Sequence, residues 1–395
     1  MKKNILVDFV YNIVATSIPI FVLQLLLLPR IAYYYNGEQY GLMVTLIAMI
    51  TVCSSRLGNA LSNIRLIDRD KILFKNNYNL ILGIFGLFSS FVVVAATIYY
   101  IGSIDVFQIL LNLLLSNLWL WRDYNVVVYR LNINYRGYLY CNIFLVIGYL
   151  LGFIIFVDSA CWQIIYIMGY IMSSVYITTT SSLWKEGLKI DKKFKKVLKD
   201  STVLSTANFL GNFSTYADRM LIYPIVGGEN VTIYYIASLF GKVLSMIFGP
   251  ISDVILSYVS KKLKRDDDIF IKVILVGGCC GIMGYILCVL LARPLLGVLY
   301  PQFVDLAMDY VPVITATMIV LVVVEMINPF IISFFDVKWQ VVINIVYIFV
   351  YIIVCLSMLL VNGMMGFCFG TMFASVIKLC IELIIYYEVK EKVLN

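Results

Sequence analysis

Four of the basic side chains within long apolar stretches of the sequence, where an unpaired charge is costly, are candidates for binding. They are Arg56, Arg122, Arg219 and Lys242. Ionisable groups in such stretches usually face the interior of a helix bundle or a water-filled cavity. The chemistry that they offer is recognition of a polar solute through charge and hydrogen bonds. The rest of the chain must therefore supply helices that hold them inside a bundle.

Polar residues recur at helical spacing around Arg219 and Lys242. The first stripe contains Thr202, Ser205, Asn208, Asn212 and Thr215, and the second contains Tyr235, Ser238, Ser245 and Ser252. Residues three or four apart share one face of a helix, so Asn208 and Asn212 are candidates for substrate contacts beside Arg219. For the serines and threonines we favour the alternative, hydrogen bonds between packed helices.

The depth of each basic side chain separates two interpretations. Arg56 and Lys242 lie far from the predicted ends of their helices, so reaching the membrane interface would be strained. For these two we favour a position in a cavity. Arg122 and Arg219 lie nearer to helix ends, and both a cavity position and extension to the interface stay open.

Acidic residues also occur within the apolar stretches. Asp123 follows Arg122 directly, and Glu325 lies in a later stretch; both are candidates for coupling to H+ or Na+. Lys378 and Glu382 are four residues apart, a spacing that lets them pair on one helix. The charge inside the apolar stretches is therefore nearly balanced. A net positive cavity requires that the acids pair elsewhere or lie at the interface.

Missing residue types exclude several kinds of chemistry. Histidine is absent, which excludes acid-base catalysis and metal binding by imidazole. The nine cysteines form no CxxC motif and have no metal-ligand spacing, so neither a metal nor another cofactor is expected. The net charge of +7 is spread over short segments, and a nucleic-acid partner is not expected.

The composition is that of an all-α polytopic membrane protein. The chain of 395 residues is 62% hydrophobic and 13% charged, with a mean hydropathy of +0.94. Apolar runs of about 20 residues predict roughly twelve spans. These are 7–29, 40–64, 78–100, 105–129, 138–157, 161–183, 201–226, 231–258, 269–292, 306–334, 339–361 and 363–387. Six precede and six follow a polar connector, which predicts two six-helix halves around a central cavity. The predicted boundaries are 1–184, 185–200 and 201–395.

Lysine and arginine alternate between the predicted loops. Every second connection is basic, beginning with Lys2 and Lys3 and including the connector. Because cytoplasmic loops are enriched in these residues, both termini are predicted to be cytoplasmic. The external connections are too short for a catalytic domain, so no enzymatic activity is expected.

The connector carries the most basic run of the chain. Its sequence, WKEGLKIDKKFKKVLKD at 184–200, combines seven lysines with apolar residues at helical spacing. One interpretation is a short amphipathic helix on an anionic membrane surface. A solvated linker whose lysines only set the orientation is the other interpretation, and the sequence does not separate them.

Two blocks of the sequence resemble bacterial polysaccharide flippases of the Wzx type, in the multidrug/oligosaccharidyl-lipid/polysaccharide exporter superfamily. Residues 28–43, LPRIAYYYNGEQYGLM, are similar to an arginine followed by Gly-x-x-x-Tyr-Gly. Residues 216–237, YADRMLIYPIVGGENVTIYYIA, are similar to the Asp-Arg segment that opens the second half. Weaker similarity occurs at 295–314 and 362–377. The chain departs from the family pattern in having twelve predicted helices where many relatives have fourteen. It also has Pro301 where the family usually has glycine, and Arg56 where an acidic residue is common.

The resemblance implies a flippase for an undecaprenyl-pyrophosphate-linked oligosaccharide, used in O-antigen or capsule assembly at the bacterial cytoplasmic membrane. Arg56, Arg219 and Lys242 would then hold the pyrophosphate in a cavity shared by the two halves, while the polyprenyl tail stays in lipid. Other polysaccharide-assembly proteins are the expected partners.

Two alternatives stay open from the sequence. A multidrug or cation exporter of the same superfamily would use Asp123 and Glu325 to bind cations. A polysaccharide polymerase or glycosyltransferase would be expected to carry a large external loop or a cluster of acids at the outer face, and neither is visible in the sequence.

Overall fold

The structure is a computed structural model of the chain. The structure describes residues 5–67, 76–188, 190, 194–242, 251, 252, 255, 258, 259 and 265–389. Within these ranges all regular structure is helical. The chain divides into two compact units, Met1–Pro224 and Ile225–Asn395, which are described separately below.

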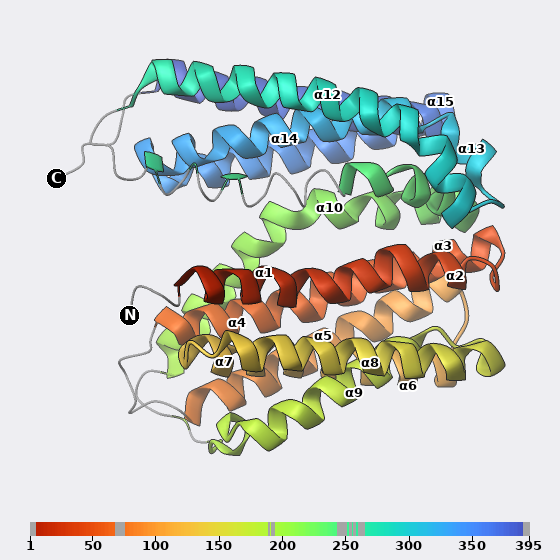
Figure 1. The fold of residues 1–395 in the computed structure, drawn as a ribbon, viewed down its shortest axis with the longest axis vertical. Helices are drawn as coiled ribbons and strands as arrows, with labels where there is room; N and C mark the ends of the chain where they lie inside the picture. The colour runs from red at the N-terminus through yellow and green to blue at the C-terminus, as the bar shows by residue number, and fades with distance from the viewer. Residues whose placement is uncertain are drawn as a thin grey trace. The chain divides into compact units, whose positions relative to one another are not determined.

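The first unit is built mainly of long helices (Figure 1). Its elements are α1 (Ile5–Phe21), η1 (Val22–Leu27), α2 (Leu28–Ile31), α3 (Gly37–Ile50), η2 (Thr51–Ser55), α4 (Arg56–Ile67), α5 (Asn76–Ile101), α6 (Val106–Asn125), α7 (Val127–Leu131), α8 (Tyr135–Ser159), α9 (Gln163–Thr180), η4 (Leu183–Lys185) and the first part of α10 (Phe194–Ala237). Both η1 and η2 are π-helical turns. Each of the first two predicted spans is therefore a helix with a local change of winding.

Among the described residues, the second unit contains the end of α10 and the helices α12 (Asp267–Leu299), α13 (Val304–Met308), α14 (Val311–Phe334) and α15 (Val337–Glu388). Its core lies where α12, α14 and α15 meet. Phe270 and Tyr386 stack with their ring centroids 3.5 Å apart, and Phe330 meets Phe270 edge-on. All three side chains are almost fully buried.

The predicted spans coincide with these helices where the structure describes them, but much of the predicted eighth span, 231–258, lies outside the described residues. Seven of the described helices are long and apolar enough to cross a membrane: Val10–Ile31, Gly37–Leu66, Asn77–Ile101, Tyr135–Ser159, Asp267–Leu299, Val311–Phe334 and Lys338–Glu388. The last of these holds two predicted spans, which meet at Gly363, where φ is +60°. Likewise, the predicted seventh and eighth spans meet at Gly227, where φ is +83°. Both positions need a left-handed backbone that glycine adopts readily.

The predicted halves, 1–184 and 201–395 with the connector 185–200 between them, stay a prediction. The two compact units of the structure divide after Pro224, within α10. The start of α10 packs on the first unit, because Val197 is buried in a cluster with Tyr78, Leu82 and Tyr124.

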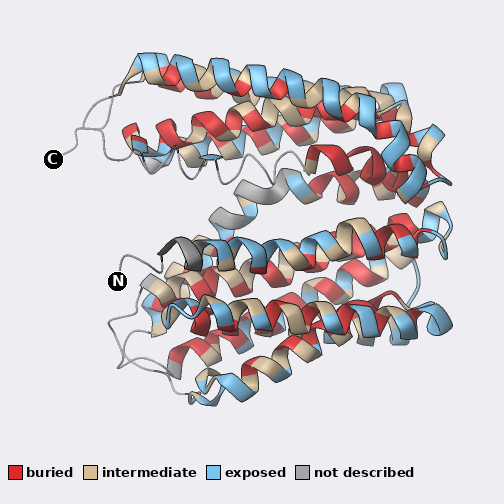
Figure 2. Ribbon diagram, viewed as in Figure 1, coloured by how far each residue is buried: buried red, intermediate tan, exposed pale blue. Residues whose placement is uncertain are grey.

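Several helices have exposed residues along their length (Figure 2), and many of these residues are large and apolar. On α12, for example, Met283, Leu290 and Val298 are exposed by 70% or more of their surface. A soluble protein rarely exposes so much contiguous apolar surface. In a bilayer these side chains contact lipid, as expected for a multi-pass membrane protein.

Glycine allows α8 and α9 to approach closely. A Cβ atom on Gly148 would lie 2.4 Å from the carbonyl oxygen of Met168, and one on Gly152 would lie 2.6 Å from the Cα of Ile165. Small residues four apart commonly bring membrane helices together in this way.

Replacing Gly148 with alanine should therefore lower the free energy of unfolding. Because the obstructing atom is backbone, the helices must separate, and we expect a loss of about 1–3 kcal/mol. Thermal unfolding in detergent micelles measures the change. Gly83→Ala is the matched control, because no heavy atom lies within 4 Å of its added Cβ. Equal melting temperatures for the two variants would contradict the close approach of α8 and α9.

The connector is fixed to the first unit by a buried ion pair. Arg65 at the end of α4 approaches the carboxylate of Glu186 at 2.7 Å, and the two side chains are only 9% and 15% exposed. Arg65 also donates to the hydroxyl of Tyr124. Asn79 of α5 donates to the carbonyl oxygens of Trp184, at 3.5 Å, and Glu186, at 2.8 Å.

These contacts bear on the two interpretations of the connector. The apolar side that was interpreted as a membrane-binding face packs on the protein at Phe194, Val197 and Leu198, although Ile190 is 72% exposed. Lys189 and residues 191–193 lie outside the described residues. The described part of the connector is therefore neither a free linker nor a helix that turns its apolar face to lipid.

Breaking the ion pair should release the connector. Arg65→Gln leaves Glu186 with an uncompensated charge, and loss of one partner of a buried pair costs about 3–5 kcal/mol. We expect trypsin to cleave after Lys185 several times faster in detergent solution. The double variant Arg65→Gln/Glu186→Gln should be cleaved more slowly than either single variant, because no buried charge is left unpaired. Arg130→Gln, an exposed arginine bonded to Asn63, is the control and should not change the rate.

Candidate functional site

The last two residues of the π-helical turn η2 and the first residue of α4 are three successive polar residues, Ser54, Ser55 and Arg56. Ser54 is fully buried, and its hydroxyl lies 2.9 Å from that of Ser89 on α5 and 2.8 Å from that of Ser116 on α6. Ser89 and Ser116 are 2.9 Å apart, so the three hydroxyls close a triangle. This serine triangle ties η2 to both neighbouring helices. π-helical turns are frequent at functional sites.

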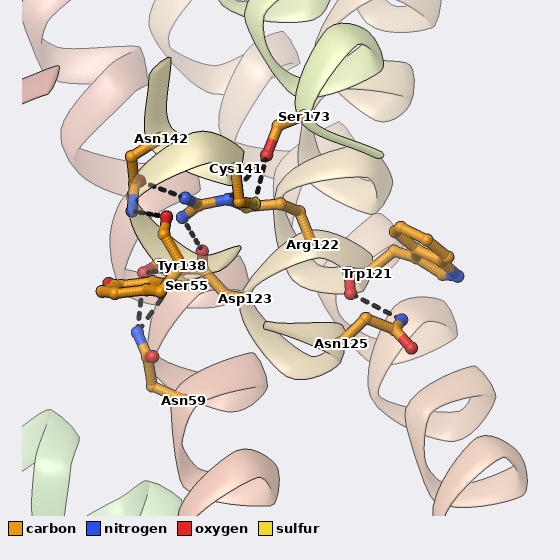
Figure 3. Close-up of polar contacts among 10 residues, drawn as sticks. All are labelled: Ser55, Asn59, Trp121, Arg122, Asp123, Asn125, Tyr138, Cys141, Asn142 and Ser173. Atoms are coloured by element: carbon orange, nitrogen blue, oxygen red, sulfur yellow. Dashed lines mark hydrogen bonds and ion pairs between the residues drawn. The ribbon is translucent and has the colours of Figure 1, made fainter. Parts of the chain in front are cut away.

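Ser55, the last residue of η2, binds Asp123, which was predicted from the sequence as a candidate for ion coupling. Its hydroxyl donates to Oδ2 of Asp123 at 2.5 Å. The side-chain amide of Asn59, one turn further along α4, donates to the same oxygen at 3.4 Å (Figure 3). A Cβ atom on Gly58 would lie 2.8 Å from the carbonyl oxygen of Leu120, so α4 and α6 are in close contact here.

Arg122 occupies the other side of the same network. Its Nη1 donates to Oδ1 of Asp123 at 3.1 Å, its Nη2 to the side-chain oxygen of Asn142 at 2.6 Å, and its Nε to Ser173 at 3.3 Å (Figure 3). Arg122 and Asp123 are 9% and 8% exposed. The pair is therefore a neutral, hydrogen-bonded unit that joins α4, α6, α8 and α9.

Arg56 points to a different part of the first unit. Its guanidinium carbon lies 5.6 Å from the centre of the Tyr216 ring on α10, and Nη2 is 3.5 Å from the Tyr216 hydroxyl. Arg219, one turn along α10, lies 5.9 Å from the same ring centre. A tyrosine face attracts cations within about 6 Å. The structure thus gathers two predicted site arginines around one aromatic ring.

The two arginines of this arginine–tyrosine cluster differ in their acidic partners. Arg219 lies 3.8 Å from the carboxylate of Asp218, and both are nearly buried. Arg56 forms no ion pair with an acid of the described residues. Its Nε is buried and has no hydrogen-bond partner among them. Such a cation is stabilised by an anion that supplies the missing acceptor.

The second unit holds the remaining predicted site residues. The half-buried Lys242 places its ammonium 4.0 Å from the centre of the Tyr235 ring. The backbone carbonyl of Glu325 accepts a hydrogen bond from Ser252 at 2.7 Å. Lys378 lies within electrostatic range of both Glu382 and Glu325, and Glu382 is 2% exposed.

The structure therefore separates the predicted site residues into groups. Arg56 and Arg219 share the Tyr216 ring, whereas Arg122 and Asp123 bind each other. Lys242 and Glu325 belong to the other unit. The side chains of Asn208 and Asn212 lie outside the described residues. The predicted cavity shared by the two halves stays a prediction.

Several residues of these networks were not predicted from the sequence. Tyr216 stands four residues after Asn212 and three before Arg219, so it belongs to the same helical stripe. That spacing was the available signal for Tyr216. Asn142 and Ser173 lie on helices for which no polar stripe was predicted, and nothing in the sequence links them to Arg122.

The sequence matches no protein-family model and no curated protein. Solved structures share its fold at low sequence identity. Lipid II flippase MurJ, in an inward closed conformation, gives a TM-score of 0.72 at 14% identity over 95% of this chain and 85% of MurJ. An inward-facing multidrug resistance MATE family transporter of the MOP superfamily gives 0.64 at 12% identity, over 96% and 100%. The Vibrio cholerae MATE transporter VcmN in its bent form gives 0.57 at 14% identity, over 96% and 95%.

These likenesses cover nearly the whole chain and include two kinds of membrane protein, a flippase and multidrug transporters. They agree with the all-helical described structure and with the apolar outer surfaces of its helices. The protein is therefore an all-α, multi-pass membrane protein of about twelve spans, with the fold shared by MATE transporters and the flippase MurJ.

Proposed function

We propose that this protein is a flippase that moves an undecaprenyl-pyrophosphate-linked oligosaccharide repeat unit across the bacterial cytoplasmic membrane. Both termini would be cytoplasmic, and the translocated unit would enter O-antigen or capsule assembly. The observation that carries the proposal is the arginine–tyrosine cluster, in which Arg56 lies within a membrane span without an acidic partner among the described residues.

The cluster suits a sugar pyrophosphate for electrostatic reasons. Arginine presents several donors in a planar fork that matches phosphate oxygens. Inside a bilayer such a bond is stronger than in water, because the local dielectric constant is low. Tyr216 offers an aromatic face next to both arginines, and the polyprenyl tail can remain in the surrounding lipid. The fold of MurJ, a lipid II flippase, supports a lipid-linked substrate.

Reconstitution tests the proposal directly. The purified protein is placed in proteoliposomes with a fluorescent undecaprenyl-pyrophosphate disaccharide, and dithionite quenches only probe in the outer leaflet. We expect the protected fraction to fall to near zero with the protein and to stay near one half in protein-free vesicles. Undecaprenyl phosphate without sugar is the control for non-specific scrambling. Equal movement of both lipids, or of neither, would contradict the proposal.

The energy source is part of the same proposal. Asp123 and Glu325 remain the candidate residues for coupling to H+ or Na+. The reconstituted assay identifies the ion when a pH gradient and a Na+ gradient are imposed separately. Coupling predicts that one gradient accelerates flipping, whereas equal rates with and without both gradients would contradict it.

A multidrug or cation exporter is the second candidate, because MATE transporters share the fold of this protein. In the first unit, however, the carboxylate of Asp123 already accepts from Arg122, Ser55 and Asn59. A cation would have to displace these donors. Proton-driven efflux of ethidium from the same proteoliposomes would favour the exporter.

A further inference from the structure

The serine triangle and the Arg122–Asp123 pair are linked to Arg56 through η2, because Ser54 belongs to the triangle, Ser55 binds Asp123, and both precede Arg56 in the chain. Ser54 and Ser55 are both bound to neighbouring helices, and the next residue in the chain is Arg56. The same short turn thus anchors the helix on one side and presents the arginine on another.

Because η2 is π-helical, the hydrogen bonds that anchor it affect the direction in which Arg56 points. A π-helical turn closes through i→i+5 hydrogen bonds and holds more residues than an α-helical turn. If η2 relaxed to α-helical winding, one residue would change register, and residues on either side would rotate relative to each other by about 100°. Arg56 would then leave the face of α4 that meets Tyr216.

Hydrogen bonds from η2 oppose that rotation. The triangle holds Ser54 between α5 and α6. Asp123 holds Ser55, and its own position is fixed by the guanidinium of Arg122, which is bound in turn to α8 and α9. All the hydroxyl and carboxylate groups involved are at most 9% exposed at residue level. Water therefore competes little with these bonds.

We propose that Asp123, held by Arg122, is a positioning residue that acts through Ser55 to fix the rotation of α4 and so direct Arg56 to the anion. This inference rests on the proposed function for the identity of the anion. It assigns Arg122 and Asp123 to support of the substrate site. They were predicted from the sequence as a substrate ligand and a coupling acid, respectively.

The distance between the side chains at positions 56 and 216 provides a test that needs no substrate. Arg56→Cys and Tyr216→Cys are introduced after the nine native cysteines are replaced by serine, and a short bis-methanethiosulfonate reagent links them. Ser55→Ala or Asp123→Asn should slow this cross-linking at least fivefold, and Ser55→Thr, which keeps the hydroxyl, should restore it. Asn117→Ala is the control, because Asn117 also joins α6 to α5, through Ser90 at 2.9 Å, but does not contact η2. Unchanged rates in Ser55→Ala and Asp123→Asn would overturn the proposal.

A double-mutant cycle then asks whether the network acts through Arg56. We measure binding of the fluorescent undecaprenyl-pyrophosphate disaccharide to detergent-purified variants. Ser55→Ala should weaken binding about tenfold when Arg56 is present and less than twofold in an Arg56→Gln background. Equal weakening in both backgrounds would mean that Ser55 acts independently of Arg56 and would overturn the proposal.

The two tests separate this inference from the proposed function. If Arg56→Gln binds the probe as tightly as the unmodified protein, the pyrophosphate assignment fails. The cross-linking result still decides whether Asp123 and Ser55 direct residue 56 to residue 216. If the cross-linking rates do not change while Arg56→Gln loses binding, the positioning role fails and the pyrophosphate site stands.

Discussion

Arg56→Gln should weaken binding of the fluorescent undecaprenyl-pyrophosphate disaccharide by about 10- to 100-fold and slow its flipping by a similar factor. Hydrogen bonds to charged groups contribute about 1.5–3 kcal/mol, and about 1.4 kcal/mol corresponds to a tenfold change in affinity. The upper part of this range is expected because Arg56 has no acidic partner among the described residues. Its positive charge therefore acts on the anion without being offset by one of these acids. Equilibrium binding in detergent and the dithionite assay in vesicles give the two numbers.

The conservative variant makes the test specific. Arg56→Lys keeps the charge but loses the planar fork, so binding should fall between that of the unmodified protein and that of Arg56→Gln. Arg293→Gln is the matched control, because Arg293 is an exposed arginine bonded to Asp305 at 3.0 Å. If all three variants bind alike, the arginine–tyrosine cluster is not the anion site.

The helices of this protein were predictable because each depends on a local property of the sequence. A segment that crosses a bilayer must satisfy its own backbone hydrogen bonds and present apolar side chains. Composition over a 20-residue window therefore locates it. The breaks at Gly227 and Gly363 also followed from local signals, since Gly227 lies between two predicted spans and Gly363 is the first residue of the last one. Winding within a span was not predictable, and neither π-helical turn was expected.

Arg122 shows why partners inside the bundle were harder to predict. The sequence left a cavity position and extension to the interface open, and the structure shows a third arrangement, an ion pair with the adjacent Asp123. Neighbouring residues on a helix do not normally face each other. The pair forms because the long arginine side chain also reaches Asn142 and Ser173 on other helices. Only the tertiary packing brings those acceptors near.

The connector shows a second limit, which concerns the surface that an amphipathic segment contacts. A lipid surface and a protein surface select the same apolar spacing. The described segment packs on α4, α5 and α6 through Val197, and the nearby ion pair of Arg65 with Glu186 holds it there. Glu186 was one of only three acids in this basic run. Its pairing required knowledge of where Arg65 lies.

Lys242→Ala should abolish flipping while leaving expression and the melting temperature close to those of the unmodified protein. The ammonium lies over the Tyr235 ring at 4.0 Å in a half-buried position, so the aromatic face holds the cation without neutralising it. We expect it to serve as a point charge for the phosphate during transport. Lys242→Arg should keep partial activity, and Lys242→Glu should have none because it repels the anion. Flipping in proteoliposomes is the measurement, and Lys338→Ala, an exposed lysine at the start of α15, is the control.

A structural role for Lys242 predicts a different pattern. If its charge serves to balance an acid, removing the acid as well should restore function, because no uncompensated charge then remains in the membrane. Glu325→Gln in the Lys242→Ala background tests this directly. Restored flipping, or full transport by Lys242→Ala alone, would assign Lys242 to charge balance and leave the anion to the arginines of the first unit. A double variant as inactive as Lys242→Ala would instead support direct contact with the substrate, since neutralising an acid cannot replace a missing phosphate ligand.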